Sequence, residues 1–135
     1  MKICFICAPG GHLIELLSLK EAFDFPGINI FMITYKEKMA LPLMGTNISK
    51  VYYLKNMLVG RIHKQKIIKY IVLLFHMLQV TLNEARMLYK EKPDIIISTG
   101  SEIAIPAFFI AKLCRIKTIY IESLTRVNDL SGTGK

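Results

Sequence analysis

The chain has 135 residues, which is enough for one domain with a single hydrophobic core and too few for two. Hydrophobic residues account for 53% of the chain and charged residues for 21%, a composition that excludes an intrinsically disordered protein and a disulfide-stapled miniprotein. The formal net charge of +8 favours negatively charged partners, namely nucleic acid, anionic lipid or a phosphorylated substrate.

The cysteines indicate a reducing environment. They are odd in number, and the apolar run after Lys2 lacks the features of a secretory signal, so we expect a cytoplasmic setting. The three cysteines are Cys4, Cys7 and Cys114. Cys4 and Cys7 have the spacing of a redox motif, but residues three apart on a strand point to opposite faces. The sequence therefore favours two ordinary core cysteines at these positions.

The first half of the chain predicts a strand, a glycine-rich turn, a helix and two further strands. Apolar residues at helical spacing follow the turn, and short apolar runs bounded by Pro, Gly or polar residues are typical of strands. In chain order, we expect a strand over 2–8, a turn at 9–12 that opens a helix, a strand over 28–34, a loop with one helical turn over 35–50, and a short strand over 51–54.

The second half predicts one long helix, or two in line, followed by a strand, a helix and a last strand. The segment 62–89 contains no Gly or Pro, which suits a long helix. Pro93 ends that helix, and Pro106 suits the first turn of the next one. We then expect a strand over 94–98, a loop over 99–105 that holds Gly100, a helix from Pro106, a strand over 117–121, and a loop-like tail over 122–135.

The alternation of strands and helices predicts an α/β domain. The expected strands are apolar throughout instead of alternately apolar and polar, which is typical of a parallel sheet covered by helices on both faces. We find no internal repeat and no low-complexity tract, so residues 1–135 are expected to form a single domain.

A basic and apolar segment in the middle of the chain predicts an interaction surface. No acidic residue lies between Lys38 and Asn83, and the run 67–80 is apolar on nearly every side of a helix. That run is shorter than the about 20 residues of a spanning helix. A cationic flank beside surplus apolar surface instead fits a helix that lies in the headgroup region of an anionic bilayer. The expected membrane contacts are Arg61, Lys64, Lys66, Lys69, Leu73, Leu74 and Met77.

The same segment also fits a partner subunit or a neighbouring helix of the domain. In either case, the isolated chain exposes an apolar patch. Nucleic acid is the less favoured partner, because the segment contains no recognisable nucleic-acid-binding module and its apolar run has no role on a phosphate backbone.

Three loops predict a ligand site at the carboxyl edge of the sheet, where open parallel sheets bind their ligands. The loops are 9–12, 98–102 and 122–123. Glycine permits positive φ and close backbone approach, so the amides of Gly10, Gly11 and Gly100 are expected to face phosphate oxygens, with a helix N-terminus behind them.

A histidine and two carboxylates at this edge predict general base chemistry. His12 with Glu102 or Glu122 can remove a proton from an attacking hydroxyl if the site holds the pKa of the residue that acts as the base near the working pH. The structural alternatives are that the two glycines only turn the chain, that His12 caps its helix or packs in the core, and that Glu102 favours a helix start. Glu122 follows an apolar strand and needs solvent, a cation or a ligand.

Two cofactor motifs are incomplete. The turn at 9–14 lacks the G-x-G-x-x-G spacing, so a nicotinamide cofactor is not expected. The segment 131–135 resembles the end of a P-loop, but no strand, Ser/Thr or helix brackets it correctly, so nucleotide hydrolysis is not expected. We expect no cofactor and no metal site.

Three stretches together resemble a known family: Gly10-Gly11-His12, Ser98-Thr99-Gly100 with Pro106, and residues 120–135 with the pattern Y-I-E-S-x-x-R-V-x-x-L-S-x-T-G-K. Over nearly its whole length, the chain resembles the membrane-associating subunit of two-part UDP-sugar transferases. That family includes the subunit that helps to add the second N-acetylglucosamine to dolichol-linked sugar, and bacterial counterparts in capsule and exopolysaccharide synthesis.

The resemblance implies a Rossmann-like domain with strand order 3-2-1-4-5, equivalent to the N-terminal, acceptor-side half of a GT-B glycosyltransferase. It places His12 near a lipid diphosphate and Glu122 beside the reaction centre. Family members continue past the Thr-Gly-Lys segment with a further helix and strand, so we expect a shortened chain. The expected substrate contacts are Gly10, Gly11, Gly100, Ser101, Glu102, Ser123 and Arg126. Glu102 departs from the family, whose bacterial members usually carry a small residue at this position.

The resemblance further implies a glycosyltransferase subunit, peripheral on the cytoplasmic face of the membrane and active only with a partner. This chain would bind a polyprenyl-diphosphate-linked sugar, and a separate donor-binding subunit would bring the UDP-sugar. An acceptor hydroxyl would attack the anomeric carbon with inversion, with Glu122 or His12 as the base. Two alternatives stay open: a non-catalytic membrane anchor or scaffold for the catalytic partner, and an independent nucleotide-binding domain.

Overall fold

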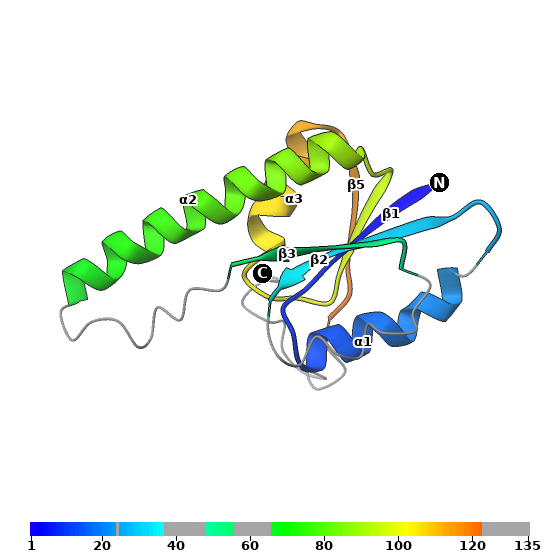
Figure 1. Ribbon diagram of the computed structural model, residues 1–135, viewed down its shortest axis with the longest axis horizontal. Coiled ribbons are helices and arrows are strands. Elements are labelled where there is room, and N and C mark those ends of the chain that lie inside the picture. The colour runs from blue at the N-terminus through cyan, green and yellow to red at the C-terminus, as the bar shows by residue number, and fades with distance from the viewer. Residues whose placement is uncertain (24, 37–47, 56–65, 123–135) are drawn as a thin grey trace.

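A five-stranded parallel sheet with helices on both faces forms the computed structural model, which describes residues 1–23, 25–36, 48–55 and 66–122 (Figure 1). The strand order is β3-β2-β1-β4-β5. In chain order, the elements are β1 (Lys2–Ile6), α1 (Gly11–Leu19), the short 3-10 helix η1 (Lys20–Phe23), β2 (Asn29–Tyr35), β3 (Lys50–Leu54), α2 (Lys66–Glu91), β4 (Ile95–Ser98), α3 (Ala104–Leu113) and β5 (Lys117–Tyr120).

The predicted fold class and strand order are confirmed, and the element bounds differ by a few residues. The long helical segment is one continuous helix, α2, instead of two in line. Helix α3 begins at Ala104, so Pro106 lies in its first turn as expected. Strand β1 is central and pairs in parallel with both β2 and β4, so Phe5 lies between Met32 and Ile97.

Two hydrophobic clusters, one on each face of the sheet, form the core. Helix α1 and η1 cover one face and helices α2 and α3 cover the other (Figure 1). Cys4 belongs to the cluster under α2 and α3, and Cys7 to the cluster under α1. Burial raises the pKa of the Cys4 thiol far above its usual range and that of Cys7 to about 12. The two cysteines therefore lie on opposite faces as predicted, and both stay protonated at neutral pH.

The two outer strands are more exposed than the sequence predicts. All residues of β2 except Asn29 are buried, whereas Lys117, Thr118 and Ile119 of β5 are exposed. Each outer strand has only one neighbour, so the helices do not cover it fully. The helices therefore cover both faces of the sheet as expected over the central strands β1, β2 and β4, and they cover the outer strands less completely.

Helix α2 crosses the sheet and continues beyond it. Buried residues recur every four positions along one side of the helix, at His76, Val80, Glu84 and Leu88, and this side faces the sheet. The N-terminal part of α2 extends past the carboxyl edge of the strands (Figure 1). We call this N-terminal part of α2, residues 66–77, the arm. It lies next to the edge of the sheet that carries the glycine loops.

At the opposite, amino edge, Glu91 ties the C-terminal end of α2 to two strands. Its carboxylate accepts hydrogen bonds from Lys2 Nζ at 2.6 Å and from Lys50 Nζ at 3.0 Å. The Tyr52 hydroxyl donates a third hydrogen bond to it. These bonds lower the pKa of Glu91 to about 2.

We expect Glu91→Gln to lower the melting temperature at pH 7 by about 5 °C. Because the folded pKa lies below the ordinary value of 4.5, the carboxylate stabilises the fold above pH 4.5, and this contribution is lost as the pH falls toward 2. The difference between the two proteins should therefore vanish near pH 2 in thermal melts followed by circular dichroism. Glu21→Gln, at an exposed position, is the control, and equal melting temperatures for wild type and Glu91→Gln at pH 7 would contradict the assignment.

Candidate functional site

The first glycine loop lies at the carboxyl end of β1. Gly10 precedes α1 with φ of +107°, and no side chain of the described residues caps the helix. A Cβ atom built on Gly10 or Gly11 would meet no atom of the described part of the chain within 4 Å. Because the first amides of a helix have no partner within the helix and carry its positive dipole end, this loop has the character of an anion site.

His12 is held at this loop by contacts from β4 and from its own helix. The Thr99 hydroxyl donates a hydrogen bond of 2.7 Å to the carbonyl oxygen of His12. The His12 Nδ1 atom lies 3.8 Å from Glu15 Oε2, one turn further along α1. The His12 side chain is 40% exposed and that of Glu15 is 21% exposed. The imidazole therefore reaches solvent on one side and faces a carboxylate on the other.

Gly100 allows the loop after β4 to pass directly beneath His12. Its φ is +120°, and a Cβ atom there would lie 3.1 Å from His12 Cε1 and 3.3 Å from the Tyr120 hydroxyl oxygen. The Gly100 amide donates a 3.1 Å hydrogen bond to the Ser98 hydroxyl oxygen, which closes the turn. The site thus requires glycine at this position for both backbone conformation and space.

Ser101 joins the two loops. It adopts a positive φ of 99°, which is rare for a residue with a side chain. Its hydroxyl oxygen accepts a 3.0 Å hydrogen bond from the amide of Ala8, just after β1. Ser101 therefore holds the loops after β1 and β4 together, and its strained backbone lies at the candidate site.

Glu122 lies at the same edge of the sheet. The Ile121 amide donates a 2.8 Å hydrogen bond to the Ser98 carbonyl oxygen, so the chain leaves β5 beside the end of β4. Glu122 is partly buried, and its Oε1 atom is shielded from solvent. The structure thus brings Gly10, Gly11, His12, Gly100, Ser101 and Glu122 to one edge.

Glu102 faces the other side of the sheet. Its carboxylate accepts a hydrogen bond from the Tyr35 hydroxyl, and Tyr35 belongs to the core cluster under α2 and α3. Burial and the nearby Glu102 carboxylate raise the pKa of Tyr35. Ser123, Arg126, Arg61 and Lys64 lie outside the described residues.

The arm of α2 beyond the sheet presents the apolar surface that the sequence predicts. Leu74 is 73% exposed, Leu73 is partly exposed, and Met77 is half-buried. Tyr70, Ile71 and Phe75 also face solvent, although the sequence analysis did not name them. For Lys66 and Lys69, only the backbone positions at the start of α2 are described. None of the helices in the described ranges is long and apolar enough to cross a membrane.

Sequence reasoning missed Glu15, Thr99 and Tyr120 as site residues. The spacing of three residues between His12 and Glu15 carries a signal, because residues i and i+3 share one face of a helix. Thr99 and Tyr120 stand in the stretches that carry the family resemblance, but no spacing in the sequence shows that they approach the His12 loop and Gly100, because those contacts join segments far apart in the chain. Within the described ranges, no group of three His, Cys, Asp or Glu side chains lies close enough together to hold a metal ion.

We expect Gly100→Ala to lower the free energy of unfolding by about 1–3 kcal/mol. Alanine is strained at a φ of +120°, and its methyl group would lie 3.1 Å from Cε1 of the His12 ring. Urea unfolding measures this change. The matched control is Gly11→Ala, whose added Cβ atom meets no atom within 4 Å among the residues that the structure describes. If both variants unfold at the same urea concentration, the close approach of Gly100 to His12 is not a structural requirement.

Known structures share this fold over nearly the whole chain. MurG of Acinetobacter baumannii has a TM-score of 0.66 at 21% identity, with 88% of this chain and 34% of that chain covered. The UDP-GlcNAc 2-epimerase from Methanocaldococcus jannaschii has a TM-score of 0.63 at 17% identity, with 99% of this chain and 34% of that chain covered. MnaA of S. aureus, solved with UDP, has a TM-score of 0.66 at 16% identity, with 95% and 32% covered.

This chain therefore spans about a third of the length of these three proteins. No curated protein sequence matches it. The sequence family described as "Oligosaccharide biosynthesis protein Alg14 like" matches residues 3–135. With its sheet order, its glycine loops and this match over nearly its whole length, the chain belongs to the Alg14-like family of oligosaccharide biosynthesis proteins.

Proposed function

We propose that this chain is the acceptor-side subunit of a two-chain glycosyltransferase that acts in polysaccharide biosynthesis, such as capsule or exopolysaccharide synthesis. It binds a polyprenyl-diphosphate-linked sugar, and a separate donor-binding subunit supplies the UDP-sugar. Membership of the Alg14-like family and the likeness to MurG support a partner subunit in lipid-linked sugar synthesis. The observation that carries the proposal is the convergence of two glycine loops, His12 and Glu122 at one edge of the sheet.

The glycine loops supply the binding part of this function. The N-terminus of α1, and Gly10 and Gly11, over which no atom of the described residues lies within 4 Å of an added Cβ, suit the diphosphate of the acceptor. Gly100 and Ser101 hold the second loop against the first, and Ser123 and Arg126 add contacts from the segment after β5. Glu102 is also a proposed acceptor contact. To accept a hydrogen bond from a sugar hydroxyl, its carboxylate would have to leave its hydrogen bond with Tyr35 on the other side of the sheet.

The chemical step is a nucleophilic substitution at the anomeric carbon of the donor sugar. An acceptor hydroxyl attacks, its proton passes to His12 or Glu122, and the bond to UDP breaks with inversion. Glu15 orients the His12 imidazole and stabilises the imidazolium that forms when His12 takes the proton. The donor and its binding residues belong to the partner, so neither chain transfers sugar alone.

Binding by the isolated chain in detergent micelles tests the acceptor side of the proposal. A polyprenyl-diphosphate-linked N-acetylglucosamine should bind saturably, and a tenfold molar excess of UDP-GlcNAc should not displace it. Saturable binding of UDP or of a nicotinamide nucleotide by the isolated chain would instead support an independent nucleotide-binding domain and contradict the proposal.

We also propose that the arm of α2 holds the complex on the cytoplasmic face of the membrane as a peripheral protein. Lys64→Glu with Lys66→Glu and Lys69→Glu should lower partitioning onto phosphatidylglycerol-containing vesicles by at least about 100-fold, because each basic residue near an anionic surface contributes about 1 kcal/mol. Vesicle flotation measures this loss.

The control carries the same change in net charge at exposed cations far from the arm, namely Lys90→Glu with Lys112→Glu and Lys117→Glu. It should lose much less binding than the arm variant. Equal losses would mean that net charge alone attracts the protein to the vesicles. If the arm variant leaves the membrane and the pair still transfers sugar to a soluble acceptor, attachment and chemistry are separate functions of this subunit.

A further inference from the structure

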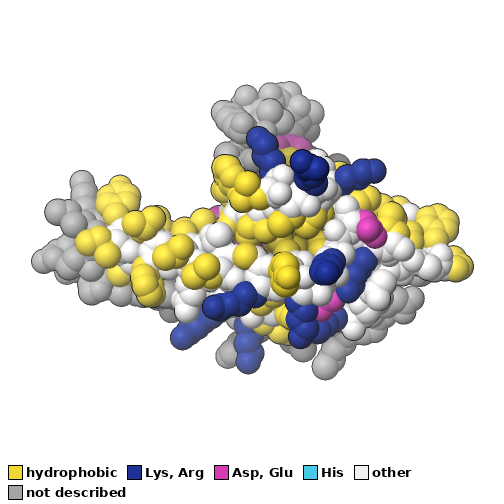
Figure 2. All heavy atoms as spheres, turned by 90° about the horizontal axis from the view of Figure 1, so that it is seen from above, with side chains coloured by type: hydrophobic (Ala, Val, Ile, Leu, Met, Phe, Trp, Pro, Cys, Tyr) yellow, Lys and Arg dark blue, Asp and Glu magenta, His cyan; other side chains and the backbone are white. Residues whose placement is uncertain are grey.

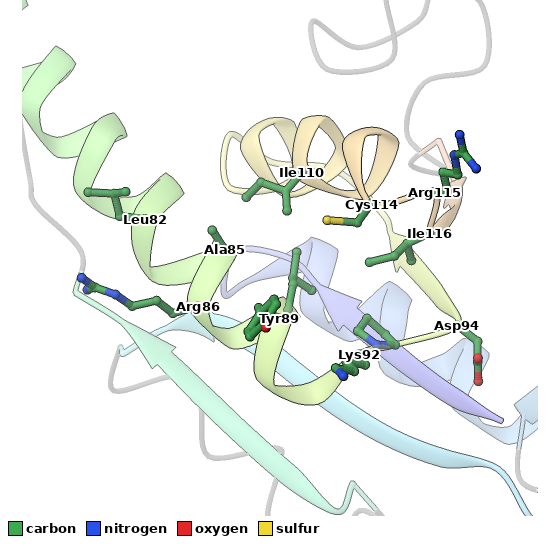
Figure 3. Close-up of a pocket in the computed structure, with 12 residues that line it drawn as sticks. Leu82, Ala85, Arg86, Tyr89, Lys92, Asp94, Ile110, Cys114, Arg115 and Ile116 are labelled. Atoms are coloured by element: carbon green, nitrogen blue, oxygen red, sulfur yellow. The ribbon is translucent and has the colours of Figure 1, made fainter.

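A groove between α2 and α3 lies away from the glycine loops. It has a volume of about 760 Å³ and reaches the start of β4 at the amino edge of the sheet. Leu82, Ala85 and Tyr89 of α2 form one wall and Ile110 of α3 forms the other (Figure 3). The groove is thus separate from the site proposed for sugar transfer, which lies at the carboxyl edge.

A row of apolar side chains on the outer side of α2 follows a heptad spacing. Leu78, Leu82, Ala85 and Tyr89 are separated by four, three and four residues. Leu82 is 50% exposed and Tyr89 is 80% exposed, on the side of α2 that points away from the sheet. An apolar row with this spacing is the seam that a second helix packs against. A bilayer instead contacts a broad convex face, which this narrow groove does not offer.

Basic side chains border the groove on both sides. Arg86 extends from α2, Arg115 follows α3 on the far side, and Lys92 lies at the end near β4 (Figure 3). None of these three cations forms an ion pair within the described part of the chain. Asp94, the one acidic side chain among the described residues that line the groove, accepts a 2.7 Å hydrogen bond from the Lys2 amide. Figure 2 shows Lys and Arg side chains gathered around the hydrophobic surface of this side.

We propose that this groove binds an amphipathic helix of another protein, with an apolar seam and acidic flanking residues. The apolar row of α2 packs against the apolar seam of the partner helix. The basic side chains at the rim of the groove form ion pairs with the acidic residues that flank that seam, as charged flanking positions do in coiled coils. A second copy of this chain presents the same basic rim, so like charges would oppose its docking. This inference goes beyond the proposed function and does not depend on the chemistry at the carboxyl edge.

The chain contains its own reporter for this groove. Cys114 lines the groove and is exposed, whereas Cys4 and Cys7 are buried. A thiol reagent such as DTNB therefore reacts first at Cys114 in the folded protein. The probe is a synthetic helical peptide of three heptads with Leu in the seam and Glu at the flanks. Saturating peptide should slow the reaction of Cys114 by about tenfold, and the same peptide with Lys in place of Glu should give no protection.

Two double variants test the rim. Arg86→Glu with Arg115→Glu should weaken binding of the Glu peptide by at least tenfold. Lys36→Glu with Lys55→Glu makes the same change in net charge at exposed positions near the carboxyl edge and should stay within twofold of wild type. Circular dichroism checks that both variants are folded.

Leu82→Gln tests the seam and should also weaken binding of the Glu peptide by at least tenfold, because it places a polar group at the centre of the apolar row.

Several results would overturn the proposal: no protection of Cys114 by the Glu peptide, equal protection by the Lys peptide, or equal losses in the two double variants. Protection of Cys114 by phosphatidylglycerol vesicles but not by the peptide would assign the groove to the membrane. A dimer seen by light scattering that the peptide does not dissociate would assign it to a second copy. Each of these results leaves the transfer activity of the pair untouched, so the proposed function is judged separately.

Discussion

Replacing His12 with Ala is expected to lower sugar transfer by the reconstituted pair by about 10²–10⁴-fold, the usual contribution of a positioned general base. The His12 ring lies over Gly100, next to the N-terminus of α1. Its Nδ1 atom is 3.8 Å from Oε2 of Glu15. Loss of the imidazole removes the proton acceptor and leaves the phosphate-binding amides in place. The expected signature is therefore a fall in kcat with little change in KM for the lipid-linked acceptor.

Three further variants separate the roles at this site. Glu122→Ala should cause the larger loss if Glu122 is the base, and the loss for His12→Ala should then be small. Glu15→Gln should lower kcat by about tenfold through misorientation of His12, and Glu15→Asp should restore part of it. Ile14→Ala, at an exposed position of α1, should leave transfer unchanged. Undiminished transfer by both His12→Ala and Glu122→Ala would remove both residues from the chemistry and would leave the membrane anchor as the better description.

Replacing Glu84 with Met is expected to stabilise the protein by several kcal/mol at pH 8. Glu84 is fully buried on the side of α2 that faces the sheet, and neither carboxyl oxygen has a hydrogen-bond partner in the described part of the structure. Burial raises its pKa from 4.5 to about 9. Methionine fills a similar volume without a polar group, so it removes the cost of burying the carboxyl.

The sign of the pH dependence follows from this raised pKa. In the unfolded chain Glu84 ionises near pH 4.5, whereas in the folded protein it stays protonated up to about pH 9. The unfolded state therefore gains relative stability as the pH rises between these values, and the full interval corresponds to at most about 6 kcal/mol. Urea unfolding from pH 5 to pH 8.5 should show that the advantage of Glu84→Met grows with pH.

Glu21→Met, at an exposed position of η1, controls for the loss of one carboxyl group and should show no such growth. An advantage of Glu84→Met that stays constant from pH 5 to pH 8.5 would mean that Glu84 is ionised in the folded protein. The window begins above pH 4.5, so it avoids the titration of Glu91, whose pKa is lowered to about 2.

The sheet was predictable because its strands and turns have strong local signals. The apolar run that ends at Pro9, Gly10 and Gly11 specifies a strand followed by a helix, and the same logic applies to the strand before Gly100. The exposure of the outer strand β5 was not predictable from its composition. Residues 117–120 look like a buried strand, but their position at the end of the sheet leaves three of them exposed.

The candidate site was predictable where loops carry glycine and was missed where contacts come from packing. His12 stands next to Gly11 in the sequence, so its place at the carboxyl edge follows from the turn. Glu84 stands on the long helix after the apolar run, and no local pattern distinguishes a buried carboxyl from one on the polar side of the helix. Glu102 lies in the predicted loop, yet its carboxylate accepts a hydrogen bond from Tyr35 of the core cluster under α2 and α3, a contact that the sequence does not indicate.

The requirement for two chains is tested by comparing sugar transfer by this chain alone, by the donor-binding partner alone, and by the two together on one lipid-linked acceptor. The proposed function requires both chains, so only the mixture should form the glycosidic bond. Transfer of sugar from UDP-GlcNAc by this chain alone, in the absence of the partner, would rule out the two-chain enzyme.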